Sequence, residues 1–148
     1  MLEVNQGRGG NVLPIKPKAV RPVLGRFVAI LGGGRTDRGL RLEELHSRVV
    51  QAGEVHEVIV TDDDSAEPGS VVDNIAYLGF VEIYRGGVLY PGEQLLAKGT
   101  SLGRLAGFDL THSPNHFNLV FVAESMHDGI QLNLQLEEEV VFQFQKLE

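Results

Sequence analysis

The chain has 148 residues, a length that fits one ordinary domain able to bury a core of its own. It contains no cysteine, which excludes disulfides, thiolate zinc sites, iron–sulfur clusters and a cysteine nucleophile. Thirteen Lys and Arg residues against twenty Asp and Glu residues give a net charge of −7, which argues against nucleic acid and anionic membrane surfaces as partners.

Residues 1–23 form a proline-rich arm, in which Pro14, Pro17 and Pro22 favour locally extended backbone. The sequence leaves open whether this arm is a flexible tail or lies across a neighbouring subunit. The N-terminal residues lack the apolar segment of a signal peptide, and no apolar run approaches the roughly 20 residues that span a bilayer. We therefore expect a cytoplasmic protein with no membrane contact and a single β-rich domain over residues 24–148.

The first predicted strand is RFVAIL, residues 26–31, which three consecutive glycines end. Between residues 40 and 50, the apolar side chains of Leu42, Leu45 and Val49 recur at helical spacing. An alternating strand also fits this segment. We expect a short helix here, because Gly53 offers a stop signal after it.

The rest of the chain reads as short strands separated by turns. Residues 54–63, EVHEVIVTDD, alternate and are rich in β-branched side chains. Residues 71–84 are apolar on both faces, as expected of a central strand covered on both sides. Tight turns at Pro-Gly and Lys-Gly divide residues 86–109, the run FNLVFVAE predicts another strand, and residues 130–136 alternate between apolar and polar side chains.

Seven or eight short strands with at most one short helix predict a mainly β fold, either a compact antiparallel β-barrel or a sandwich. The segments FVAIL, VVDNIAYLGFVEIY and VVFQF supply much apolar strand surface. Because that surface has to be covered, we also expect a homo-oligomer.

Side chains able to bind a ligand are densest in residues 107–122, GFDLTHSPNHFNLVFV. His112 and His116 are four residues apart, a spacing that places two imidazoles on one face of a helix. Pro114 lies between them and makes a continuous helix improbable, so the pair is expected in a loop.

Such a loop could still bring two imidazoles to a divalent metal such as zinc. His112 and His116 would then be metal ligands, and His56 or a carboxylate from Asp109 or Glu82 would complete a set of nitrogen and oxygen donors. His56 lies on the valine face of its strand, where a lone histidine is more often a hydrogen-bonded core residue than a ligand.

Two other interpretations of the loop stay open. Its Asp, Thr, Ser and Asn side chains commonly cap their own turn, which would make the loop purely structural. Alternatively, the loop lines a metal-free polar pocket for a small molecule. The candidate ligand-binding residues are Asp109, Thr111, His112, Asn115, His116 and Glu82.

Two classes of function follow from these candidates. The first is a module that binds a small molecule or a metal ion without turnover, which we prefer. The second is a metal-assisted or acid/base enzyme that uses the loop of His112 and His116. No GxSxG, P-loop or dinucleotide-binding signature is present to favour a particular reaction.

The motifs EVHEVIVTDD, YLGFVEI, GGVLYPGE and GFDLTHSPNH are similar to those of a small bacterial family of unknown function, over most of residues 20–145. More remotely, GGVLYPGEQL followed by His116 before an apolar strand resembles the sugar-alcohol phosphotransferase IIA component, over about 60 residues. The second resemblance implies a small β-barrel phosphocarrier. In that family the phosphorylated histidine precedes the Pro-Gly turn, whereas here LGFVEIYRGGVLY contains no histidine.

Overall fold

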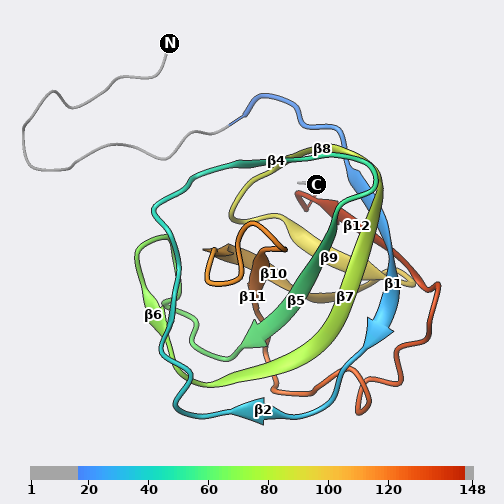
Figure 1. Cartoon of the computed structure of the whole chain (residues 1–148). Coiled ribbons are helices and arrows are strands. Elements are labelled where there is room, and N and C mark those ends of the chain that lie inside the picture. The colour runs from blue at the N-terminus through green and yellow to red at the C-terminus, as the bar shows by residue number, and fades with distance from the viewer. Residues whose placement is uncertain (1–16, 146–148) are drawn as a thin grey trace, which may run out of the picture.

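The computed structural model describes residues 17–145, which form twelve strands and contain no helix (Figure 1). The prediction of a mainly β fold is therefore confirmed. Most of the proline-rich arm, residues 1–16, lies outside the described residues. The strands are β1 (Val23–Ile30), β2 (Gly34–Arg35), β3 (Leu40–Arg41), β4 (Arg48–Val50), β5 (Val55–Thr61), β6 (Val71–Val72), β7 (Ile75–Arg85), β8 (Gly87–Leu89), β9 (Gln94–Ala97), β10 (Thr100–Asp109), β11 (Asn118–Val122) and β12 (Glu139–Gln143).

The main sheet has the order β1-β12-β9-β10-β11-β5-β7-β2, and β7 also pairs with β1. The hydrogen-bonded order therefore returns to its starting strand, as the end-on view of Figure 1 shows. The pairing of β11 with β5 is parallel, so the sheet is mixed and not purely antiparallel as predicted. Parallel neighbours need a long crossover connection, and the chain from β6 through β10 supplies it.

Two hydrophobic cores lie on opposite faces of the sheet. The main core is enclosed by the sheet and includes Phe27, Val58, Phe108, Phe121 and Phe142. The second core lies on the outer face, where the segment containing β3 and β6 covers β5, β7, β10 and β11. Its buried members are Leu40, Leu42, Ile59, Ala66, Val72, Ile75, Ala106 and Val120.

The short helix expected between residues 40 and 50 does not form, and this prediction was wrong. Leu40 and Leu42 are both buried in the second core, which requires the alternation of an extended chain. The Leu42 N–H donates to the Ser70 carbonyl oxygen and the Glu43 N–H to the Phe108 carbonyl oxygen. Long-range backbone hydrogen bonds thus replace the local bonds of a helix.

The strand expected at residues 130–136 is also absent. Its backbone is a series of turns, in which the Leu132 N–H donates to the Asp128 carbonyl oxygen and Asn133 has a φ of 57°. Only Leu134 of the four apolar side chains in this segment is buried, while Ile130 is 69% exposed. The alternation therefore does not mark a half-buried strand.

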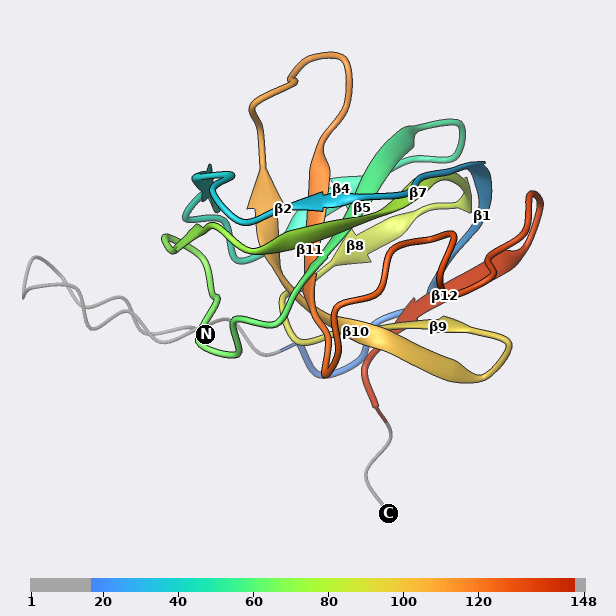
Figure 2. The ribbon, with the colours of Figure 1, turned by 90° about the horizontal axis from the view of Figure 1, so that it is seen from below.

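The central strand predicted at residues 71–84 is confirmed from Ile75 onward by β7, which pairs with β1, β2 and β5, whereas Val71–Val72 form the separate strand β6. The strands β5 and β11 run in the same direction, and we call the end of the molecule where both finish the carboxyl end. The loop of residues 110–117 lies at the other end, the loop end. Figure 2 shows this loop (orange) standing out at the top, away from the turns that follow β5 and β11. Residues 17–145 contain no helix long and apolar enough to cross a membrane.

Candidate functional site

A row of four side chains crosses the outer face of the sheet at the loop end. The strand registers pair Asp109 with Asn118, Asn118 with Glu57 and Glu57 with Phe80. Paired residues on neighbouring strands point to the same face, so these side chains are adjacent. Asp109, Asn118 and Glu57 are buried, which is unusual for groups of this polarity.

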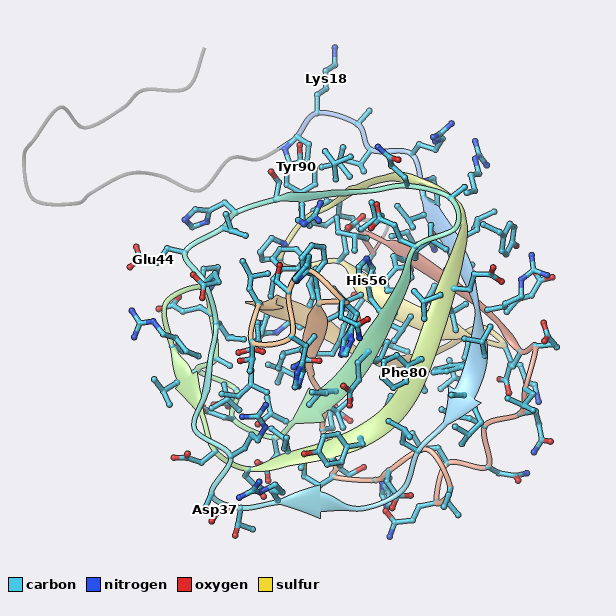
Figure 3. All side chains as sticks on the ribbon, in the orientation of Figure 1. Lys18, Asp37, Glu44, His56, Phe80 and Tyr90 are labelled. Atoms are coloured by element: carbon cyan, nitrogen blue, oxygen red, sulfur yellow. The ribbon has the colours of Figure 1, made fainter. Side chains whose placement is uncertain are left out.

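His116 lies over this row. Its Nε2 atom is 3.5 Å from Oε1 of Glu57, and only 11% and 12% of the two side chains are exposed. The imidazole meets the Phe80 ring edge-on at a centroid separation of 5.1 Å. His112 stacks on the other side of His116 at 5.0 Å and is itself exposed. Figure 3 shows Phe80 on β7.

Two buried polar atoms of this group have no hydrogen-bond partner among the described residues. They are Nε2 of His116 and Oδ1 of Asn118. The Nδ1 atom of His116 lies 2.9 Å from the side-chain amide of Asn115. Nε2 of His116 nevertheless faces the Glu57 carboxylate, so the polar atom left without any polar neighbour close by in this cluster is Oδ1 of Asn118.

Asp109 acts within the protein as a cap for the start of the loop. Its carboxylate accepts hydrogen bonds from the Thr111 N–H at 3.1 Å, the Thr111 hydroxyl at 2.9 Å and the Asn118 amide at 2.9 Å. These contacts fix the turn that leads from β10 toward His112. Asp109 and Thr111 therefore hold the loop, as the structural interpretation expected.

His56 lies on the opposite face of β5. It precedes Glu57, and successive strand residues alternate between faces. Its ring stacks on Phe117 at 4.6 Å, and the Arg48 guanidinium covers the other side of Phe117 at 3.8 Å. Nδ1 of His56 accepts from the Phe117 N–H at 3.0 Å, and Nε2 donates to Glu54 at 2.7 Å. Burial lowers the pKa of His56, against a smaller opposing effect of Glu54.

The structure thus brings His112, Asn115 and His116 together and places two other candidates elsewhere. His56 faces the main core side, where Figure 3 shows it on β5, and Glu82 is 4.0 Å from the Arg26 guanidinium. Within residues 17–145, no three His, Asp or Glu side chains gather closely enough to hold a metal ion. Metal binding by the histidines stays a prediction.

Sequence reasoning missed Glu57 and Asn118, the two buried members of the row closest to His116. A weak signal was present for Glu57, because it alternates with the apolar residues Val55 and Ile59 along one strand face. No such signal marks Asn118. Its position beside Glu57 depends on the parallel pairing of β11 with β5.

A pocket of about 710 Å³ opens at the carboxyl end, and we call it the carboxyl-end pocket. Its apolar lining includes Val60, a member of the main core, together with Leu102 and Ala123, which pack against that core. Its polar lining comes mainly from the turns after β5 and β11 and from the start of β10. The charged and titratable members are Asp62, Asp64, Arg104, Glu124 and His127.

The acidic run of residues 62–64 lies in the turn after β5, where Asp62 and Asp64 are exposed. Asp62 and Asp64 line the carboxyl-end pocket. Oδ1 of Asp62 accepts from the Asn74 side chain at 2.9 Å, and the Asp64 carbonyl oxygen accepts from the Arg104 guanidinium at 3.0 Å. The bond from Arg104 ties the turn to β10, and the bond from Asn74 ties it to the segment before β7.

The chain belongs to the family of unknown function DUF6917, whose model matches residues 17–143. No curated protein and no solved structure matches the chain. The comparisons therefore support the family resemblance inferred from the motifs and do not show the remoter one to the sugar-alcohol phosphotransferase component.

Proposed function

We propose that this member of the family DUF6917 is a small-molecule-binding module whose ligand occupies the carboxyl-end pocket. One observation carries the proposal, a pocket of about 710 Å³ lined by both apolar and polar residues. We call its apolar residues Val60, Leu102 and Ala123 the floor and its polar residues the rim. Sites for small molecules usually have volumes of about 300–1,000 Å³ and combine apolar walls with a few polar groups that orient the ligand. The floor adjoins the main core, so its walls are held by packed strands.

A fragment screen by NMR tests this proposal. Uniformly ¹⁵N-labelled protein is titrated with a mixed library of neutral, cationic and anionic fragments, and the backbone amides are followed. We expect the shifted amides to cluster at Val60, Leu102 and Ala123. The exposed Ser125 lines the pocket, so Ser125→Trp should block binding, while Ser113→Trp in the exposed loop at the other end should not. If no fragment of the library changes the chemical shifts of the pocket amides, the proposal is refuted.

A second candidate function is acid/base catalysis at the loop end. The observation that favours it is the unpartnered Nε2 of His116 beside the Glu57 carboxylate. A carboxylate next to an imidazole can orient it and stabilise its protonated form, so that the imidazole exchanges protons with a bound substrate. His116 would be the acid or base, Glu57 its positioning residue and the exposed His112 a contact for substrate.

The same loop is where a divalent metal would bind if His112 and His116 are ligands. Thermal melts with and without Zn²⁺, Ni²⁺ or Mn²⁺ test this, because a metal that binds the folded state raises the melting temperature. The rise should weaken as the pH falls through the histidine range near 6.5, since neutral imidazole is the ligand. An unchanged metal effect in the double variant His112→Ala, His116→Ala would remove the pair as ligands.

A further inference from the structure

We propose that the ligand of the carboxyl-end pocket is an organic cation, an amine that carries an alkyl portion. This inference rests on the proposed function, because it names the chemical class that the same pocket would take. It is carried by the way in which apolar and charged groups are divided over the wall of the pocket.

The apolar part of the wall is suited to a hydrocarbon chain. Val60 is buried in the main core, and Leu102 and Ala123 pack on it, so the floor is a rigid surface. Leu132 adds a side chain that is 37% exposed at the pocket. Burying methylene groups on such a surface is favourable, whereas a compact inorganic ion gains nothing from it.

The charged part of the wall is negative. Three acidic residues, Asp62, Asp64 and Glu124, line the pocket together with one arginine, Arg104, and one histidine, His127. The Arg104 guanidinium donates to the Asp64 carbonyl oxygen, which keeps its positive charge beside the acidic turn and partly offsets that turn. The remaining excess of negative charge favours an ammonium group over a carboxylate or phosphate.

The net charge of the whole chain also favours a cationic ligand. A net charge of −7 attracts cations toward the surface and repels anions. A neutral polyol would gain little from three carboxylates at the rim, because it offers no charge for them to stabilise. An alkyl amine uses both parts of the wall, its chain on the floor and its ammonium at the rim.

Three probes of equal chain length separate these ligand classes: 1,4-diaminobutane, 1,4-butanediol and succinate. Each is titrated into ¹⁵N-labelled protein near physiological salt, where weak non-specific attraction is screened. We expect the diamine to shift the pocket amides and to bind about tenfold more tightly than the diol, with succinate weaker still.

Charge-removing variants show whether the carboxylates of the pocket are responsible. Asp62→Asn and Glu124→Gln should each weaken diamine binding about threefold to tenfold. Asp37→Asn and Glu44→Gln are matched controls, since both side chains are exposed and Figure 3 shows them at the periphery. Equal losses in all four variants would mean non-specific attraction to an acidic protein and would overturn the inference.

The two proposals fail in different ways. If neutral or anionic probes shift the pocket amides and the diamine does not, the binding function stands and the cation class is wrong. If no fragment and no probe shifts these amides, the pocket is not a binding site and both proposals fall.

Discussion

His56 sits between two hydrogen bonds that require it to be neutral. Its Nδ1 atom accepts the Phe117 N–H, and a proton on Nδ1 would turn this contact into a clash of two donors. Burial lowers the pKa of His56 from its usual 6.5, and the Arg48 and His116 charges act in the same direction, against Glu54. Protonation would therefore release Phe117, the residue that ends the histidine loop.

The first prediction concerns stability in acid. A lowered folded pKa means that the unfolded chain takes up the proton first, so the free energy of unfolding should fall as the pH drops below about 6.5. Each unit of lowering is worth about 1.4 kcal/mol. Urea denaturation of His56→Asn, which keeps an acceptor near the position of Nδ1, should show a flatter pH dependence between 7 and 5 than the wild type. His46→Asn, at an exposed histidine, should match the wild-type slope.

Glu93 is a buried carboxyl group in the turn between β8 and β9. Its Oε1 atom accepts the Tyr90 N–H at 2.8 Å, and its Oε2 atom has no partner among the residues described. Burial raises the pKa of Glu93 to about 7, although the hydrogen bond from Tyr90 opposes this. Near neutral pH the folded protein therefore keeps much of this carboxyl group protonated.

The second prediction follows from this raised pKa. Between pH 4.5 and 7 the unfolded chain loses the proton of Glu93 and the folded chain holds it, so stability should fall as the pH rises through this window. At pH 8, Glu93→Gln should unfold at higher urea, with a gain of about 1–3 kcal/mol, because the amide resembles the protonated acid. The gain should vanish near pH 4.5. A loss of stability of equal size at both pH values would contradict the assignment.

At the scale of elements, the β11–β12 connection is held tightly against the sheet at Gly129. Its N–H donates to the Tyr77 carbonyl oxygen at 3.0 Å. A Cβ atom at this position would lie 2.1 Å from the Leu78 carbonyl oxygen and 2.8 Å from that of Leu31. Both neighbours are backbone atoms, one in β7 and one directly after β1, and the Leu31 N–H is hydrogen-bonded to the Leu78 carbonyl oxygen, so they have little freedom to move.

The third prediction is that Gly129→Ala destabilises the protein by about 2–3 kcal/mol, because one added methyl group forces backbone to shift. Thermal or urea unfolding measures the loss. Gly87→Ala is the control, since its Cβ would first meet only a Val23 side-chain carbon at 3.1 Å. Similar losses in both variants would mean that the close approach at Gly129 is not what holds the connection.

The strands that were predicted from sequence are those whose pattern is long and unambiguous. β5 and β7 are both rich in β-branched or other apolar residues. β5 is too short for a surface helix, and β7 is apolar on both faces. The helix predicted within residues 40–50 did not form because Leu42 fits both a helical and an alternating pattern, and the second core decided between the two. The strand predicted over residues 130–136 did not form, because alternation alone does not show that a partner strand is available.

The candidate site was predicted in part. The spacing and the proline were enough to place His112 and His116 together in a loop. The sequence could not show which face of β5 the loop covers, because His56 and Glu57 are neighbours in the chain and point to opposite faces. The carboxyl-end pocket was missed because it joins turns that are far apart in the chain, and no local pattern marks such a meeting.

At the scale of the whole molecule, exposed apolar side chains bear on the expected homo-oligomer. Ile130 and Leu136 are 69% and 62% exposed on the β11–β12 connection. The fourth prediction is that the protein self-associates through this connection, because large apolar side chains exposed to water favour a protein contact. Sedimentation equilibrium should give a mass above 16.2 kDa.

Variants locate the contact. Ile130→Glu and Leu136→Glu should shift the sedimenting species toward the monomer, and Val71→Glu, at a 52% exposed valine on β6, should not. A wild-type protein that sediments only as the monomer at high concentration would contradict the prediction.

The return of the sheet order to β1 has a consequence for how the chain folds. β1 is held on one side by β12, with Val23 opposite Phe142, and on the other by β7. Contacts between segments so far apart raise the contact order, which slows folding because much loop entropy is lost before the contacts form. During synthesis, one edge of β1 stays unpaired until its partner β12 has left the ribosome. An exposed edge of this kind can pair with another chain, so folding yield should depend on chain concentration during refolding.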